Sequence, residues 1–178
     1  MAVEATRLEG GFVQSESDAG TLHFFAGRVA SGKTTAARKF SADHCAVMVC
    51  EDEWLVRLFG GATTLEEYLQ RRDRIRSVLE LHVPAILSAG ASVVFDFSGN
   101  TRKDRAWVKS LASAAAAPHV LHWLDADDSI CRERLTLRNE TKPVGIYWGH
   151  VTEQLFDQVN RHFQPPQSDE DLTIVRHP

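Results

Sequence analysis

The chain has 178 residues, of which 43% are hydrophobic and 25% are charged, and its formal net charge at pH 7 is −4. This composition is ordinary for one folded domain and argues against a disordered or fibrous chain. Because the chain carries no excess of positive charge, general nucleic-acid binding is disfavoured, and a small-molecule partner is expected.

The sequence also gives no sign of export or of a membrane anchor. Its three cysteines are an odd number without a CxxC pair, and the N-terminal segment lacks the basic, apolar and small-residue parts of a secretory signal. No uninterrupted apolar run approaches the roughly 18 to 20 residues that cross a bilayer. We therefore expect a cytoplasmic protein that does not span a membrane.

Residues 1–20 are rich in Gly, Ser, Glu and Ala without a clear period, and they are expected to form an N-terminal arm to a single domain over residues 21–178. In that domain, apolar runs typical of strands alternate with amphipathic segments typical of helices. Strands are predicted at residues 21–27, 46–52, 91–99, 119–126 and 172–177. Helices are predicted at residues 33–40, 54–59, 64–90, 101–117, 127–139 and 152–163. This alternation predicts an α/β fold with a parallel sheet and helices on both of its faces.

The longest predicted helix has both a start signal and an interruption. Thr64 and Glu67 have the T-x-x-E spacing of a capping box, and the glycines at residues 60–61 are expected to end the short helix before it. Pro84 removes a backbone N–H, so we expect it to kink the long helix or to divide it in two.

The stretch GRVASGKTT, residues 27–35, follows the first predicted strand and leads into the first predicted helix. Its first eight residues have the pattern GxxxxGK(S/T), in which inward-turned backbone N–H groups and a helix N-terminus bind nucleotide phosphates. In this pattern Lys33 reaches the β- and γ-phosphates of ATP, and the Thr34 hydroxyl ligates Mg²⁺. The expected nucleotide-binding residues are Gly27, Arg28, Val29, Ala30, Ser31, Gly32, Lys33, Thr34 and Thr35.

Asp52, in the sequence CEDEW, ends the second predicted strand at the edge where open α/β sheets bind ligands. A carboxylate there can take the proton of an attacking hydroxyl, which phosphoryl transfer to an alcohol requires. Asp is also favoured as a helix N-cap, so a structural role is the alternative. Glu51 and Glu53 compete for the catalytic role, because the sequence does not fix which side chain points toward the loop.

Asp96 ends the apolar run SVVFD of the third predicted strand. An acid in this position beside a phosphate-binding loop is typical of a group that supports Mg²⁺, although an Asp at a strand end can also have no ligand. Asp96 and Gly99 also spell D-x-x-G, but no N-K-x-D sequence for guanine accompanies them. A GTPase switch is therefore weakly supported.

Arg134 and Arg138 are four residues apart in a predicted helix, so their guanidinium groups share one face and repel unless an anion lies between them. A triphosphate would provide that anion, and both arginines are candidates to stabilise the transferred phosphoryl group. The glycines and proline of residues 140–150 predict a loop, so residues 134–150 are expected to form a mobile lid. A solvated helix face without a ligand is the alternative.

Asn100 and Arg102 directly follow the third predicted strand, again at the ligand-binding edge, and are candidates to bind the acceptor. Their alternative roles are structural, because Asn100 or Thr101 can cap the next helix and Arg102 can simply be exposed. A denser run of arginines, at positions 71, 72, 74 and 76, is interpreted as a solvated face of the long helix.

With the loop and the sequences EDEW, VVFDFSGNTR and RLTLRN in this order, residues 21–178 resemble the P-loop kinase-like proteins of the AAA-33 or zeta-toxin-like group. Related members include chloramphenicol phosphotransferase, gluconate and shikimate kinases, and the kinase part of polynucleotide kinase. The resemblance implies a three-layer P-loop NTPase fold, with a five-stranded parallel sheet in the order 2-3-1-4-5 and a mobile lid. It also implies that Asp52 is the general base and that Arg57 binds the substrate. For the γ-phosphate contact it leaves both Arg134 and Arg138 open.

These observations predict an ATP- and Mg²⁺-dependent kinase that phosphorylates a hydroxyl group of a small molecule. Asp52 would deprotonate the alcohol, while Lys33 and a lid arginine would stabilise the charge of the transferred group. One alternative is a nucleotide-dependent switch or binding module with slow ATPase activity. Another is a kinase for the 5′-hydroxyl of nucleic acids, which would need a basic channel leading to Asp52.

Overall fold

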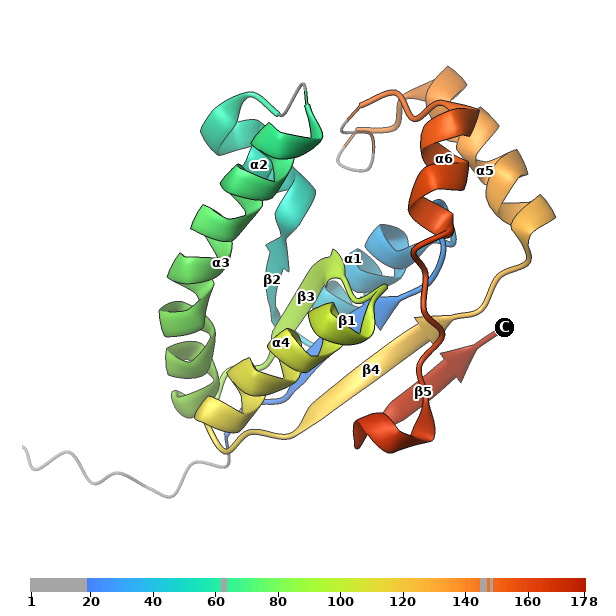
Figure 1. The fold of residues 1–178 in the computed structure, drawn as a ribbon. Helices are drawn as coiled ribbons and strands as arrows, with labels where there is room; N and C mark the ends of the chain where they lie inside the picture. Colours follow the sequence, from blue (N-terminus) through green and yellow to red (C-terminus); the bar gives the residue numbers. More distant parts are fainter. Residues whose placement is uncertain (1–18, 62–63, 145–146, 148) are drawn as a thin grey trace, which may run out of the picture.

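The computed structural model describes residues 19–61, 64–144, 147 and 149–178, so nearly all of the expected N-terminal arm lies outside the described residues. Helices surround a central sheet (Figure 1). The strands are β1 (Leu22–Ala26), β2 (Val47–Cys50), β3 (Val93–Ser98), β4 (His119–Leu124) and β5 (Ile174–His177). The helices are α1 (Lys33–Asp43), α2 (Glu51–Phe59), α3 (Leu65–Ser88), α4 (Arg102–Ala114), α5 (Asp128–Thr141) and α6 (Glu153–Asn160), with a short 3-10 helix, η1 (Ser168–Glu170).

The sheet has the order β2-β3-β1-β4-β5, and its neighbouring strands are parallel, which confirms the topology that the resemblance implied. Parallel strands end at a common edge, so the segments that follow β1, β2 and β3 meet there. The helices α2, α5 and α6 lie at this end of the sheet (Figure 1). Among the described residues, none of the helices combines the length and the apolar character needed to cross a membrane.

Each face of the sheet has its own apolar cluster. Phe24 and Phe95 pack on the face covered by α2, α3 and α4, whereas Phe25 and Val94 pack on the face covered by α1 (Figure 1). Successive side chains of a strand point to opposite faces, and both faces are covered. This explains why the strands read as nearly continuous apolar runs.

The second strand is shorter than expected. β2 ends at Cys50 and Glu51 begins α2 directly, so Asp52 lies in the first turn of a helix and not at the end of a strand. Three consecutive acids, residues 51–53, occupy this first turn. Their charges are favourable beside the partial positive charge of a helix N-terminus, which favours an early start of the helix.

The expected helix boundaries around residues 60–64 are confirmed. Gly60 has a φ of +71°, which glycine adopts without strain, and its N–H donates to the carbonyl of Val56 at 2.9 Å. The Thr64 hydroxyl accepts a hydrogen bond from the N–H of Glu67 at 3.1 Å, as an N-cap does. These two ends fix where α3 packs against α2.

Pro84 does not divide the long helix, which was one of the two expected outcomes. α3 is continuous from Leu65 to Ser88 with Pro84 inside it. Leu79, Val83 and Leu87 lie before and after the proline, and all three are buried in the same apolar cluster. Burial of these apolar side chains offsets the free energy lost because the proline has no N–H to donate.

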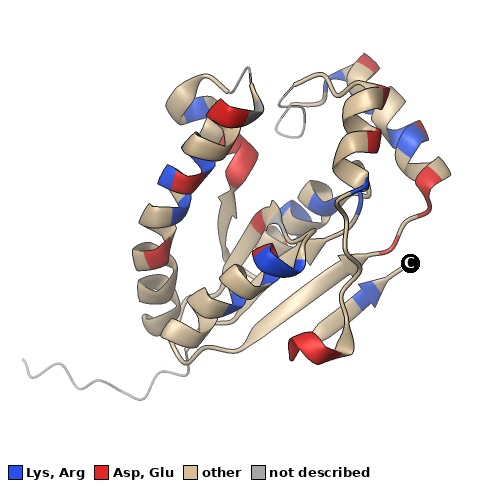
Figure 2. Ribbon diagram, viewed as in Figure 1, with Lys and Arg blue, Asp and Glu red and all other residues tan. Residues whose placement is uncertain are grey.

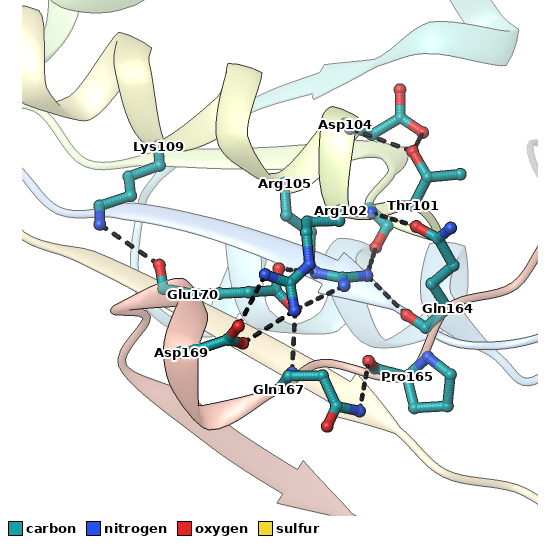
Figure 3. A network of polar contacts seen from close by, with 11 residues as sticks. Thr101, Arg102, Asp104, Arg105, Lys109, Gln164, Pro165, Gln167, Asp169 and Glu170 are labelled. Atoms are coloured by element: carbon teal, nitrogen blue, oxygen red, sulfur yellow. Dashed lines mark hydrogen bonds and ion pairs between the residues drawn. The ribbon is translucent and has the colours of Figure 1, made fainter.

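Arg105 of α4 joins the C-terminal segment to the sheet edge where the strands end. Its side chain is fully buried, and its Nε and Nη2 donate to the two carboxylate oxygens of Glu170 at 2.6 and 2.7 Å. Its Nη1 donates to the carbonyls of Gly99 and Gln164, at 3.0 and 2.8 Å. Figure 3 shows this guanidinium among groups of α4 and of the segment that leads to β5. Such charge-assisted bonds hold the chain that follows β3 in place.

A chain of three histidines crosses the sheet on the side of α1. The Nδ1 of His23 in β1 lies 3.2 Å from the Nε2 of His122 in β4, and the Nδ1 of His122 lies 3.1 Å from the Nε2 of His177 in β5. His44, directly after α1, also acts electrostatically on His23 and His122. Burial, together with the three neighbouring histidines, lowers the pKa of His122 from 6.5 to about 4.

This histidine chain predicts a loss of stability in acid. Since His122 titrates near 6.5 when unfolded and near 4 when folded, the unfolded chain binds more protons between these values. The free energy of unfolding contributed by neutral His122 is therefore complete above pH 6.5 and falls, by up to ~3 kcal/mol, as the pH drops to 4. Urea denaturation across this range should give a shallower pH dependence for His122→Gln than for the wild-type chain. His82→Gln, on the exposed face of α3, is the control and should keep the wild-type slope; equal slopes in all three proteins would contradict the prediction.

Candidate active site

The predicted phosphate-binding loop has the local geometry that its sequence requires. It connects the end of β1 to the start of α1, and Gly32 serves as the N-cap of that helix with a φ of +103°. A Cβ on Gly27 would lie 2.6 Å from both the carbonyl oxygen of Leu124 and the Oγ of Ser31, so no larger residue fits there. The N–H groups at the start of α1 therefore face a site at the sheet edge where a phosphate can bind.

Lys33 lies across this loop. Its Nζ donates to the carbonyls of Gly27 and Arg28, at 2.7 Å in each case. Burial lowers its pKa to about 8, although the carboxylates of Asp96 and Asp52 act in the opposite direction. The same interactions place both acids within electrostatic reach of the Lys33 ammonium.

Asp52 and Asp96 approach the loop from neighbouring elements. In the sheet, Cys50 at the end of β2 pairs with Asp96 of β3, and the Cys50 thiol donates to Asp96 Oδ2 at 3.3 Å. Asp52 remains accessible to water, yet the protein around it and then the charge of Asp96 raise the pKa of its carboxyl group, while Lys33 and Arg138 oppose this. Cys50, not Asp52, is the N-cap of α2, so the capping role considered for Asp52 does not apply.

The three consecutive acids at the start of α2 point in different directions. Glu51 is buried between α2 and α3, where its Oε1 accepts a hydrogen bond from the Tyr68 hydroxyl at 2.7 Å. Glu53 pairs with Arg38 of α1 at 3.1 Å and with Arg57 of α2 at 2.8 Å. Of the three carboxylates, that of Asp52 has interactions with Lys33, Asp96 and Arg138.

The two arginines of α5 differ in their contacts. Arg134 is exposed, and its Nη1 donates to the carbonyl of Ser31 in the loop at 2.9 Å. Arg138 is half-buried, and its charge acts on both Asp52 and Lys33, while burial lowers its pKa. Arg134 therefore holds the loop from outside, whereas Arg138 lies within electrostatic reach of its lysine and of Asp52.

Two residues for which the sequence predicted no role join α5 and α6 to each other and to the loop. Arg132 of α5 binds Glu153 and Asp157 of α6 and stacks over the Phe156 ring at 4.6 Å. Asn160 of α6 accepts a hydrogen bond from the N–H of Val29 at 2.9 Å. Only the favourable i to i+4 pair of Asp128 with Arg132 was visible in the sequence. Residues 145, 146 and 148 of the expected lid lie outside the described residues.

A family comparison agrees with this loop and topology. The model of the family AAA_33, described as an AAA domain, matches residues 22–166, which is most of the chain. The chain belongs to the AAA_33 family. Comparison with curated proteins gives no match.

Solved structures resemble this AAA_33 domain at low sequence identity. A candidate kinase from Chloroflexus aurantiacus has a TM-score of 0.71 and 15% identity, with 90% of this chain and 85% of that chain covered. The APS kinase CysC of Mycobacterium tuberculosis, in complex with AMPPNP and APS, has a TM-score of 0.60 and 16% identity over 89% of each chain. Kti12 of Chaetomium thermophilum, in complex with ADP-AlF3, has a TM-score of 0.64 and 16% identity over 87% of this chain and 88% of that chain. At such identities the likeness establishes a kinase-like P-loop fold.

The residues present in the AAA_33 domain fit a magnesium ion. Mg²⁺ prefers oxygen ligands and is usually held by one or two carboxylates or hydroxyls together with substrate phosphates. Thr34, in the first turn of α1, carries a hydroxyl beside the loop, and Asp96 carries a carboxylate near Lys33. A divalent cation would also offset the repulsion between Asp96 and Asp52.

Besides Asp52, three residues of the AAA_33 domain were expected to bind the substrate, and all three contact other parts of the chain. Asn100 accepts a hydrogen bond from the Gly27 N–H at 3.1 Å, which ties the loop to the end of β3. Arg102 binds both oxygens of Asp169 at 2.8 and 3.0 Å, and Thr101, not Asn100, is the N-cap of α4. The side chain of Arg57 is 72% exposed and pairs with Glu53. In the structure Asn100 thus supports the loop, Arg102 binds the segment that leads to β5, and Arg57 lies at the surface.

The interpretation of the arginine run as a solvated face is wrong for three of its four members. Figure 2 shows acidic and basic positions mixed along α3. The side chains of Arg71, Arg72 and Arg76 are only 27%, 23% and 12% exposed, and Arg74 is the exposed one. The sequence could not show this, because α3 is covered by α2 and α4 and its burial depends on both.

Proposed function

We propose that this AAA_33 domain is a kinase that transfers the γ-phosphoryl group of ATP, with Mg²⁺, to a hydroxyl group of a small molecule. The observation that carries this proposal is the position of Asp52, whose carboxyl interacts with the loop lysine, with Asp96 and with Arg138. A loop that binds phosphate needs no such acid for binding alone. A carboxylate with a raised pKa is a better proton acceptor than an ordinary aspartate, and phosphoryl transfer to an alcohol needs one.

In the proposed reaction, the acceptor oxygen bonds to the γ-phosphorus and the bond from that phosphorus to the β–γ bridging oxygen breaks. The hydroxyl proton moves to Asp52, and ADP leaves with the electron pair of the broken bond. Lys33 and Arg138 stabilise the negative charge on the transferred group. Thr34 and Asp96 would hold Mg²⁺, which neutralises phosphate charge when bound. The other residues of the loop, from Gly27 to Thr35, would surround the phosphates through their N–H groups.

The solved structures support this proposal through what their descriptions state. One is an APS kinase in complex with AMPPNP and APS, and another is a gluconokinase of Sinorhizobium meliloti. Both are kinases named for small molecules. A neighbour from an RNA repair complex, with 19% identity, instead motivates the third possibility, a nucleic-acid kinase.

Incubation with ATP labelled in the γ-phosphate tests the proposal directly. The wild-type protein, with Mg²⁺ and fractionated metabolites, should transfer the label to a small alcohol, and Lys33→Met should not. A 5′-hydroxyl oligonucleotide is included as a separate acceptor, and its salt-dependent labelling would identify a nucleic-acid kinase instead. Release of labelled inorganic phosphate, with no acceptor labelled in any fraction, would overturn the proposal.

A nucleotide-dependent switch is the second candidate, and the contacts of α5 and α6 with the loop favour it. Arg134 binds the Ser31 carbonyl and Asn160 binds the Val29 N–H, so a change in the loop would reach both helices. A partner protein that is recovered only with nucleotide, together with ATP consumption that no acceptor changes, would favour the switch over the kinase.

A further inference from the structure

The four arginines of α3 at positions 71, 72, 74 and 76 have different partners, and three of them have an evident structural place. Arg71 donates to the carbonyl of Gly61 and lies 3.7 Å from the carboxylate of Glu67, so it closes the turn after α2. Arg74 is exposed on the outer side of the helix. Arg71 therefore contacts the C-terminal end of α2, and Arg74 points toward solvent.

Arg76 connects α3 to α4. Its Nη2 lies 2.8 Å from Asp104, and its guanidinium lies over the ring of Trp107 at 4.3 Å. Asp104 is itself fixed by a hydrogen bond with the Thr101 hydroxyl at 2.6 Å. Arg76 therefore has a carboxylate partner and an aromatic platform, which together account for its burial.

Arg72 has no comparable partner among the residues that the structure describes. The carboxylate in ion-pair range of it is that of Asp73, its exposed sequence neighbour, at 3.5 Å. Its Nε, like that of Arg76, is buried without a hydrogen-bond partner, and only 23% of its side chain is exposed. The difference between the two arginines is that Arg76 has a carboxylate partner at 2.8 Å. The protein therefore satisfies only part of the hydrogen-bonding capacity of this guanidinium, and a bound anion would satisfy the rest.

The surroundings of Arg72 join it to the proposed phosphoryl-transfer site. Its guanidinium lies 5.9 Å from the centre of the Tyr68 ring, and the Tyr68 hydroxyl is bound to Glu51. The charges of Arg72 and Asp52 both act on the Tyr68 hydroxyl and on Glu51. Arg72 and Asp52 thus both lie within electrostatic reach of the pair formed by Tyr68 and Glu51.

Glu51 makes no direct ion pair with Arg72. Its Oε2 is buried and lacks a hydrogen-bond partner, so it makes no direct bond to Arg72. Burial raises the pKa of Glu51 to about 7, although the hydrogen bond from Tyr68 and the charges of Arg76 and Arg72 oppose this, so near neutral pH its carboxylate is only partly ionised. An external anion can then complete the pairing of Arg72, for which the protein supplies Asp73 at 3.5 Å.

We propose that Arg72 binds an anionic group of the phosphoryl acceptor, so that the acceptor is an alcohol that also carries a carboxylate or a phosphate group. This inference rests on the proposed kinase function, because Asp52 faces the hydroxyl of the same molecule. The planar guanidinium is suited to either anion, since both accept paired hydrogen bonds from it. Its charge would then select anionic alcohols over their neutral analogues.

The first test compares matched alcohols as acceptors for the wild-type protein with labelled ATP and Mg²⁺. Gluconate against glucose and glycerate against glycerol test a carboxylate, and glycerol 3-phosphate against glycerol tests a phosphate. The anionic member of a pair should be phosphorylated with the lower KM. In Arg72→Gln that KM should rise about 10- to 100-fold with little change in kcat, as expected for the loss of a charged hydrogen bond. Arg74→Gln, with the same charge change on the exposed side of α3, should behave as wild type.

The second test measures anion binding without turnover. Thermal unfolding of the protein with AMPPNP and Mg²⁺ is followed while sodium sulfate replaces sodium chloride at constant ionic strength. Sulfate stabilises folded proteins in general, so the readout is the difference between variants. The melting temperature should rise more in the wild type and in Arg74→Gln than in Arg72→Gln, with Arg72→Lys in between because it keeps the charge without the planar fork.

The two tests separate this inference from the kinase proposal. Suppose that label is transferred, but the KM is the same for anionic and neutral alcohols and does not change in Arg72→Gln. The anion site is then overturned while the kinase proposal stands. If no alcohol is labelled but sulfate still distinguishes Arg72→Gln from Arg74→Gln, the anion site stands and the kinase proposal fails. Equal sulfate effects in all variants would overturn the anion site without reference to transfer.

Discussion

Asp52→Asn is expected to lower phosphoryl transfer by about 10²- to 10⁴-fold while leaving the affinity for ATP nearly unchanged. Asparagine keeps the size of the side chain but cannot accept the proton of the acceptor hydroxyl. The carboxyl group lies within electrostatic reach of Lys33, yet the loop holds Lys33 through the carbonyls of Gly27 and Arg28. Nucleotide binding should therefore survive the substitution.

Transfer is measured as label incorporated into the acceptor, and ATP affinity by titration of each variant with nucleotide. Glu53→Gln is the matched control, because it makes the same chemical change at the next residue, whose carboxylate binds Arg38 and Arg57 instead. It should retain transfer within a few-fold of wild type. Turnover in Asp52→Asn equal to that of Glu53→Gln would remove Asp52 from the mechanism.

The raised pKa of Asp52 adds an expectation on pH. The protein that surrounds this carboxyl and the charge of Asp96 raise its pKa, so the group accepts a proton only above a pH higher than that of an ordinary aspartate. The acidic limb of the transfer rate should therefore fall at a pH above the usual range of aspartate. In Asp52→Asn this limb should be absent from the residual rate.

The features that local patterns specify were predictable from the sequence. The phosphate-binding loop depends on a few neighbouring residues between a strand and a helix, and Gly27 and Gly32 have the backbone and the space that this pattern requires. The cap at Thr64 and the end of α2 at Gly60 are equally local. The strand order came from the resemblance to a family, because alternating strands and helices are compatible with several orders.

The directions of side chains at the start of α2 were not predictable. In a helix each residue turns the next side chain by about 100°, so the residue at which the strand ends decides which of three consecutive acids faces the loop. The sequence placed that end at residue 52, and the structure places it at Cys50. This shift of two residues sends Glu51 toward Tyr68 and Glu53 toward Arg38.

Contacts between distant residues were also beyond the sequence. Arg76 binds Asp104, which is 28 residues away, and Asn160 binds Val29 across 131 residues. No rule of sequence spacing links such pairs. The sequence therefore indicated a solvated charge at Arg76 and no role for Asn160. The same limit hid the difference between Arg72 and Arg74, which only the packing of α3 against α2 and α4 reveals.

The arginines of α5 provide the second large expected effect. Arg138→Ala should lower kcat by about 10³-fold with little effect on ATP affinity, because an arginine that stabilises the transferred phosphoryl group acts mainly in the transition state. The observation behind this is that the Arg138 charge acts on both Lys33 and Asp52. The rate is measured with saturating acceptor, so that a change in kcat is separated from one in KM.

Arg134→Ala removes the same charge one helical turn away and is the matched comparison. Its guanidinium binds the carbonyl of Ser31, so its loss should loosen the loop, weaken nucleotide binding and leave kcat at saturating ATP much closer to wild type. If Arg134→Ala lowers kcat more than Arg138→Ala does, the two roles are exchanged. If neither variant changes kcat, the charge of the transferred group is stabilised by Lys33 and the loop alone. Helix α5 then has no part in the chemistry of transfer.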